Sequence, residues 1–152
     1  MRAAGCFAID GVYYTGDRYD RAAKFHTDTK NFRREIPLTH VDNLVNPEIV
    51  LDASVIAIEL TEGAIPLPEF VHPTAAFYIL GPEDGTINQS IIDQCESVVY
   101  VPTQSSLNLA VTANIILYDR LCKSSYSHNG DQLIRQSRDT NNATRWKNPT
   151  SS

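Results

Sequence analysis

Residues 77–85 read Phe-Tyr-Ile-Leu-Gly-Pro-Glu-Asp-Gly, and residues 98–110 read Val-Val-Tyr-Val-Pro-Thr-Gln-Ser-Ser-Leu-Asn-Leu-Ala. Each stretch starts with an apolar run typical of a buried strand, continues into a tight loop with proline, and leads to a segment of helical composition. In open α/β sheets, ligands bind where strand ends meet helix starts. Two such loops close together in sequence predict one pocket built from both.

The rest of the chain alternates predicted strands and helices, which favours an α/β fold with a parallel sheet flanked by helices. Buried-type strands are predicted at 53–60, 76–80 and 97–100, and helices at 88–95 and 107–123. We also expect the end of a helix at 2–8, a short strand at 11–14, an extended segment at 36–38, a short helix at 41–45, and mostly loop at 63–73.

Length and composition indicate one ordinary globular domain, since 152 residues are 42% hydrophobic and 20% charged. No apolar run is long enough to span a membrane, and no secretory signal is visible. The three cysteines and four histidines have no metal or redox spacing. We therefore expect a cytoplasmic protein with reduced thiols, no metal site and no membrane contact.

Charge is distributed unevenly along the chain. Residues 1–36 carry a net +2, residues 37–123 a net −9, and residues 124–152 a net +2. Although the whole chain is acidic, its first segment holds a cluster of cations that either forms a local phosphate-binding face or is a solvated loop. The members of this candidate RNA-binding cluster are Arg18, Arg21, Lys24, Lys30, Arg33 and Arg34.

The predicted last helix, 107–123, is apolar nearly all round, so it is buried on more than one side. It is either a core helix under a loop or a helix packed between its own sheet and a second subunit. Residues 124–152 are rich in Ser, Asn, Thr and charges and lack periodicity. We predict a domain at 1–123 and a disordered polar tail at 124–152.

The motifs resemble those of the SPOUT superfamily, in particular its SpoU (TrmH-like) branch of RNA ribose methyltransferases, over residues 2–123. The matching motifs are a Gly-Pro-Glu loop at Gly81-Pro82-Glu83, a hydrophobic-Pro pair at Val101-Pro102, a Ser-Leu-Asn helix start at Ser106-Leu107-Asn108, and an Arg on an early helix at Arg2.

This resemblance implies a SPOUT fold with a C-terminal deep trefoil knot. It also implies methyl transfer from S-adenosylmethionine to a ribose 2′-hydroxyl of tRNA or rRNA by a homodimer. The cofactor-binding residues that it implies are Glu59, Leu60, Leu80, Gly81, Glu83, Val101, Pro102, Ser106 and Leu107. The catalytic candidates are Arg2, Glu83, Ser106 and Asn108.

Several of these residues have a structural alternative. Gly81 and Glu83 also suit a plain strand-to-helix turn, and Ser106 and Asn108 also suit a helix N-cap. Arg2 is a poor base because its guanidinium stays protonated, so we expect it to orient the 2′-hydroxyl and neutralise the adjacent phosphate.

The sequence departs from the family pattern in two places. The family has a strand and a loop with Asn before the Arg, and here Met1 directly precedes Arg2, so we expect the family's first strand to be missing. Only residues 103–105 separate Pro102 from Ser106, which predicts a tighter pocket rim. A non-catalytic SAM- or RNA-binding homodimer is the main alternative. A flavodoxin-type nucleotide-binding protein is another, although the chain has no Gly-rich phosphate loop.

Overall fold

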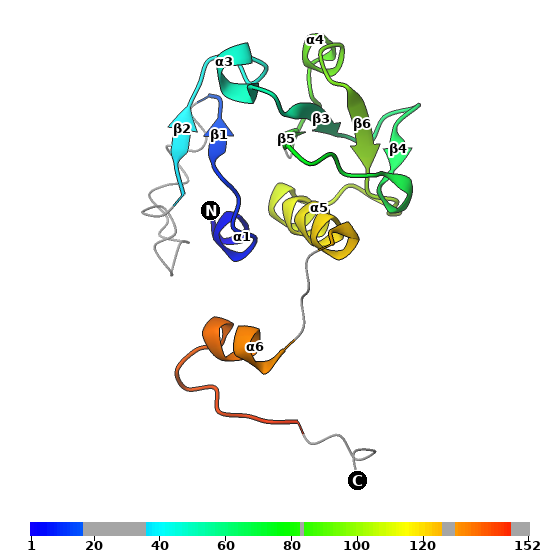
Figure 1. Ribbon diagram of the computed structural model, residues 1–152. Coiled ribbons are helices and arrows are strands. Elements are labelled where there is room, and N and C mark those ends of the chain that lie inside the picture. The colour runs from blue at the N-terminus through cyan, green and yellow to red at the C-terminus, as the bar shows by residue number, and fades with distance from the viewer. Residues whose placement is uncertain (17–35, 83, 126–129, 147–152) are drawn as a thin grey trace.

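A computed structural model describes residues 1–16, 36–82, 84–125 and 130–146, and a four-stranded parallel sheet lies at its centre (Figure 1). The strand order is β4-β6-β3-β5, and a separate parallel pair is formed by β1 and β2. The strands are β1 Val12–Tyr14, β2 Leu38–His40, β3 Ser54–Ile58, β4 Ile65–Pro66, β5 Ala76–Leu80 and β6 Ser97–Tyr100. The α/β prediction with a parallel sheet flanked by helices is confirmed.

The helices lie on both sides of the four-stranded sheet. They are α1 Arg2–Cys6, α3 Pro47–Val50, the 3-10 turn η2 Leu67–Glu69, α4 Gln89–Ile92, α5 Leu109–Lys123 and α6 Asp131–Ser137. In Figure 1, α1 and α5 lie on one side of the sheet, while α3 and α4 lie on the other. α6 follows α5 in the chain and is drawn apart from the sheet.

Strand β3 is buried on both faces because its residues alternate between two core clusters. Ile56 and Ile58 pack with Ile116 of α5 in one cluster. Val55 and Ala57 pack in the other, which the partly buried side chains of α3 and α4 also cover. Ala57 is 0% exposed and Ile116 is 1% exposed. The continuous apolar run that marked this strand in the sequence therefore fits its position between two layers of helix.

Helix α5 starts two residues later than predicted, because Asn108 caps it. The Asn108 side-chain oxygen accepts a hydrogen bond from the Val111 amide at 2.9 Å, which satisfies one of the free N–H groups of the first turn. The helix ends after Lys123, and two cations in its last turn complement the helix dipole.

The last turn of α5 is attached to the loop between β4 and β5 by side chains that bond to main-chain carbonyls. Arg120 donates to the carbonyls of Pro73 and Thr74 at 2.8 and 2.7 Å. Lys123 donates to the carbonyls of Leu67 and Phe70 at 2.6 and 3.0 Å. These bonds connect parts of the chain about 46 to 56 residues apart in sequence.

A hydrogen-bonded chain of side chains reinforces the same contact. His72 Nδ1 lies 2.6 Å from the Tyr78 hydroxyl, and His72 Nε2 lies 2.9 Å from Asp119 Oδ2. Since Arg120 Nη1 donates to the Tyr78 oxygen at 3.1 Å, the Tyr78 hydroxyl is free to donate to Nδ1 of a neutral imidazole. The other ring nitrogen then donates to Asp119, which also pairs with Lys123 at 2.7 Å.

Burial favours this neutral form of His72, whose side chain is only 5% exposed. Desolvation lowers the pKa of His72 below its usual 6.5, and the hydrogen bond and charge of Asp119 offset this effect only in part. Desolvation acts to raise the pKa of Asp119, but the hydrogen bonds from Lys123 and His72 outweigh it and leave that pKa below its usual 3.8. The network therefore holds a neutral imidazole beside an ionised carboxylate at neutral pH.

Some predicted elements differ from the structure. The short helix predicted at 41–45 is wrong, and a helix forms instead at Pro47–Val50. Asn46 caps that helix by accepting from the Glu48 amide at 3.0 Å, and Pro47 suits its first turn. The helix predicted at 88–95 is shorter, covering Gln89–Ile92. In the polar tail, where the sequence predicted no helix, Asp131–Ser137 forms α6 with all seven residues exposed.

None of the helices in the described residues is long and apolar enough to cross a bilayer. Nor do these residues contain a group of three or more His, Cys, Asp or Glu side chains placed to hold a metal ion.

We expect the protein to lose stability as the pH falls from 7.5 to 5.5. The depressed pKa of His72 means that the unfolded chain binds protons more readily, so this contribution is complete above about 6.5 and declines below it. The variant His72→Phe should lose about 1–3 kcal/mol at pH 7.5, because it removes two hydrogen bonds to half-buried partners, and should show a flatter pH dependence. Thermal unfolding at several pH values measures both effects.

The exposed His40 provides the control, and His40→Gln should keep the wild-type pH profile. A His72→Phe variant whose melting temperature falls with pH as steeply as that of the wild type would contradict this account.

Candidate functional site

The carboxyl ends of β3, β5 and β6 meet at one edge of the sheet. Ile58 is in register with Leu80 of β5 and Val99 of β6. The amide of Glu59 extends the β3–β6 pairing by donating to the Val99 carbonyl at 3.0 Å. The residues that follow these strand ends, Leu60, Gly81 and Val101, therefore lie at the same edge. This is the edge at which an α/β sheet binds ligands.

Glu59 holds the loop after β5 in place. One carboxylate oxygen accepts from the Leu60 amide and the other from the Ile87 amide, each at 2.9 Å. Ile87 is itself buried in the core on the α4 side of the sheet. The loop from Gly81 to Ile87 thus begins at the end of β5 and is fixed at its far end by a charged acceptor and a buried side chain.

Glycine suits position 81 because there is little room for a side chain, not because of its backbone conformation. Its φ lies outside the left-handed region, but a Cβ at this position would lie 3.0 Å from Glu59 Oε2 and 3.2 Å from Ile87 Cγ1. Any larger residue would have to displace the carboxylate or the buried isoleucine. The close approach at Gly81 is therefore made by the side chain of Glu59 at the neighbouring strand end.

The second loop, residues 101–108, has its own internal hydrogen bonds. Thr103 donates its amide to the Val101 carbonyl at 2.9 Å and its hydroxyl to the Ser105 carbonyl at 2.8 Å. The loop then ends at Asn108, which caps α5. Of the two proposed cap residues, Asn108 is the one that caps, while Ser106 is exposed. Sequence reasoning did not select Thr103, although a Thr after a Pro in a short loop commonly forms such a turn.

Several apolar side chains near this edge are only partly buried. Leu60 is 49% exposed, and Leu80, Val101 and Leu107 are half-buried. Apolar side chains beside the main-chain groups of strand ends are typical of a small-molecule site. Of the cofactor-binding residues predicted from sequence, the register of the strands brings Glu59, Leu60, Leu80, Gly81 and Val101 to one edge. Glu83 lies outside the described residues.

Arg2 lies at the start of α1, and α1 contacts α5. Its side chain is exposed, and within the described residues no hydrogen bond or ion pair engages the guanidinium. The structure therefore leaves Arg2 available to bind an external anion. The cationic cluster from Arg18 to Arg34 falls outside the described residues.

A cavity of about 570 Å³ lies elsewhere, at the other end of α5. It is lined by residues 68–74 and by Arg120, Lys123, Ser124 and Ser125. Since α5 has 15 residues, about 20 Å separate this cavity from the helix start beside the strand-end site. Arg120 and Lys123, the cations that line it, already donate to main-chain carbonyls. The cavity is thus part of the contact that fixes α5.

Comparison with known families matches residues 1–118 to the SpoU rRNA Methylase family. No curated protein matches the chain.

Several solved structures share the fold. The SpoU methyltransferase AviRb from Streptomyces viridochromogenes, solved with AdoMet, aligns with a TM-score of 0.63 and 21% identity over 80% of this chain and 50% of its own. The TrmH/SpoU tRNA modifying enzyme of A. aeolicus aligns with a TM-score of 0.60 and 17% identity, over 80% of this chain and 65% of its own. An RNA 2′-O ribose methyltransferase aligns with a TM-score of 0.56 and 17% identity, over 80% of this chain and 49% of its own. The chain thus spans about half to two thirds of the length of these proteins, and the likeness is one of fold.

We expect Glu59→Ala to loosen the loop from Gly81 to Ile87. A hydrogen bond to a charged acceptor contributes about 1.5–3 kcal/mol, so protection of the Ile87 amide from hydrogen exchange should fall about tenfold or more. The nearby exposed Glu62 provides a matched control, and Glu62→Ala should leave that protection unchanged. Equal protection of Ile87 in both variants would show that Glu59 does not hold the loop.

Proposed function

Since this chain belongs to the SpoU rRNA Methylase family, we propose that it is an RNA methyltransferase that transfers a methyl group from S-adenosylmethionine to a ribose 2′-hydroxyl. The observation that carries the proposal is the meeting of the Gly81 and Val101 loops at the carboxyl edge of the sheet. The 2′-hydroxyl as acceptor follows from one structural neighbour, an RNA 2′-O ribose methyltransferase. The proposed substrate is a tRNA or an rRNA.

The strand-end residues are well suited to hold the cofactor. Main-chain groups at Leu80, Gly81 and Val101 would bond the adenine, while Leu60 and Leu107 would cover its faces. Bound S-adenosylmethionine supplies the electrophilic methyl group. The Glu59 carboxylate is already used by the Leu60 and Ile87 amides. We therefore give Glu59, which the resemblance implies as a cofactor-binding residue, the role of positioning the cofactor loop.

Arg2 is the proposed substrate-orienting residue. A guanidinium remains protonated at neutral pH, so it binds a phosphate and donates to the ribose oxygen rather than removing its proton. Methyl transfer needs an in-line approach of the oxygen, and fixing that approach supplies much of the rate. Glu83, Ser106 and Asn108 remain candidates at the rim of the same site, Asn108 through the cap that fixes the start of α5.

RNA binding is assigned to the cationic segment from Arg18 to Arg34, because the body of the chain is strongly acidic. Residues 37–123 hold only two Lys or Arg against eleven Asp or Glu. That body would repel RNA phosphates, whereas a basic segment gains affinity for RNA from the release of counterions.

We also propose a cytoplasmic location and, from the family resemblance, a knotted passage of α5.

A homodimer is proposed from the surface of α5. Ile116 lies in the core, so a substitution there would not test for a dimer. Leu109, Val111 and Tyr118 are exposed on the same helix. Val111 and Tyr118, seven positions apart, share one face of the helix, and an exposed apolar face of this kind favours a symmetric, isologous contact with a second copy.

Arg2→Ala should abolish methyl transfer while leaving S-adenosylmethionine affinity nearly unchanged. This pattern is expected when a side chain acts on the substrate but not on the cofactor. The assay is tritium transfer from labelled cofactor to bulk RNA from cells lacking the gene, with calorimetry for the cofactor. Wild-type transfer by Arg2→Ala would remove Arg2 from the mechanism. Cofactor or RNA binding by the wild type without any transfer would instead favour a non-catalytic binding protein.

Val111→Asp should convert the dimer to a monomer. Val111 is 41% exposed in the isolated chain, so a carboxylate there is solvated in the monomer and desolvated in the dimer. Light scattering should give about twice the 16.9 kDa chain mass for the wild type and about one chain mass for the variant. Leu133→Asp on α6, also at an exposed apolar residue, should remain dimeric. A wild-type monomer at micromolar concentration would contradict the proposal.

A further inference from the structure

The segment after the family match carries an aromatic side chain that the fold does not use. The match ends at residue 118, and the described part of the tail, 130–146, consists of α6 and an irregular stretch. Trp146 in that stretch is 83% exposed, and it is the only tryptophan of the chain. An indole combines a large apolar ring with a polar N–H, so a partner that covers this exposed ring would gain apolar burial.

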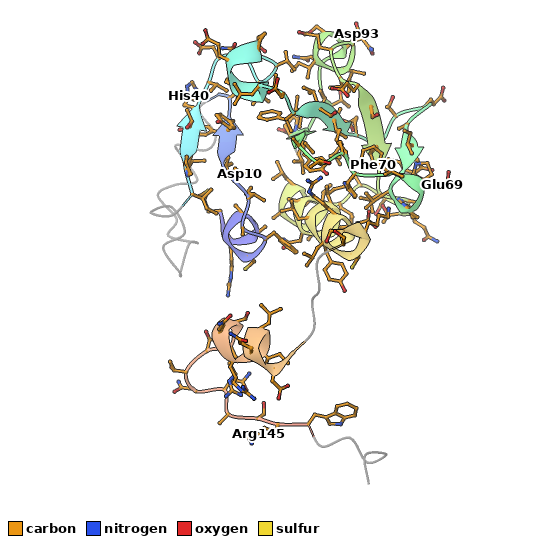
Figure 2. All side chains as sticks on the ribbon, in the orientation of Figure 1. Asp10, His40, Glu69, Phe70, Asp93 and Arg145 are labelled. Atoms are coloured by element: carbon orange, nitrogen blue, oxygen red, sulfur yellow. The ribbon has the colours of Figure 1, made fainter. Side chains whose placement is uncertain are left out.

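Cations flank this tryptophan on both sides in the sequence. Arg145 precedes it and Lys147 follows it. Figure 2 shows Arg145 on the stretch after α6, apart from the sheet. Among the described residues, Arg145 has no ion-pair partner, whereas Arg135 of α6 pairs with Asp131 at 3.3 Å. The charge of Arg145 is thus available to an external anion.

A turn fixes the chain just before these residues. The Asn142 amide donates to the Asp139 carbonyl at 2.9 Å. The Thr144 hydroxyl donates to the Asn142 side-chain oxygen at 2.7 Å, and the Thr144 amide donates to the same oxygen at 3.3 Å. This Asx-type turn restricts the backbone that leads into Arg145, which lowers the entropy lost when the segment binds.

We propose that Arg145 and Trp146 form a contact for single-stranded RNA, in which the indole stacks on an unpaired base and the cation binds an adjacent phosphate. This inference rests on the proposed RNA methyltransferase function. Tryptophan stacks on any unpaired base, and alternation of aromatic and cationic side chains is the pattern of single-strand binding. A base-paired duplex does not offer a free base face to the indole.

The charge distribution favours RNA over a protein surface of this chain. Residues 124–152 hold four Lys or Arg against two Asp or Glu, while the domain from 37 to 123 carries a net −9. The basic segments at both ends of the sequence can hold RNA phosphates that the acidic body would repel. The alternative to RNA binding is that Trp146 packs on the exposed apolar face of α5 in a second copy of the chain.

The single tryptophan makes the test direct. Titrating the full chain with a single-stranded oligouridine of 12 nucleotides should quench the fluorescence of Trp146, and a duplex of equal length should quench it much less. Trp146→Ala should weaken binding of the single strand by about fivefold to a hundredfold, as expected for loss of one stacked base. Trp146→Phe should retain most of the affinity, and Leu133→Ala, which removes an exposed apolar side chain of α6, should leave it unchanged.

Methyl transfer and cofactor affinity, measured on the same samples, separate this inference from the proposed function. If the wild type methylates RNA but Trp146→Ala binds the oligonucleotide as tightly, the tail contact is overturned and the proposed function stands. Quenching and affinity loss as predicted, without transfer by the wild type, would support the contact and overturn the enzyme. A blue shift of the emission that depends on protein concentration and needs no RNA would overturn the contact in favour of docking on protein.

Discussion

Burial of strand β3 on both faces is the constraint on which the rest of the structure depends. Its alternating side chains belong to two separate hydrophobic clusters, one closed by α5 and the other covered by α3 and α4. Burying an aliphatic side chain contributes about 1.5–3 kcal/mol, so a polar residue at any of these positions would disrupt the cluster to which that side chain belongs. Because β3 pairs with both β5 and β6, the same strand also fixes the two loops of the site relative to each other.

Helix α5 joins the site to the stability of the fold. Its first turn is capped by Asn108 at the end of the Val101 loop, and Ile116 in its middle belongs to the core. Its last turn is bonded to the loop before β5 through Arg120 and Lys123. A shift of the helix at its far end would therefore move the rim of the strand-end site. The network around His72 holds the end of α5 that lies about 20 Å from that rim.

Short-range patterns in the sequence predicted much of this arrangement. The continuous apolar runs gave the bounds of β5 and β6 directly, since a buried parallel strand shows such a run. The helix predicted at 41–45 was wrong because Asn46 followed by Pro47 is a stronger helix start than Asp42. Helix α6 has no packed face, so no apolar periodicity marked it.

The contacts that periodicity does not reveal are those between distant residues. Glu59 and Ile87 are 28 positions apart, and His72 and Asp119 are 47 apart. The family resemblance implies Glu59 as a cofactor-binding residue, but its two acceptor roles depend on the register of the strands. Nothing in the spacing of the histidines singles out His72, because only the packing of α5 against the loop before β5 provides its partners.

The central claim is that the cofactor binds at the carboxyl ends of β3, β5 and β6, rather than in the cavity at the far end of α5. Amide hydrogen exchange with and without saturating S-adenosylmethionine tests it most directly. We predict added protection in residues 59–60, 80–87 and 101–108, with little change in 67–74 and 120–125. Protection confined to the second pair of segments, or no protection anywhere, would contradict the account.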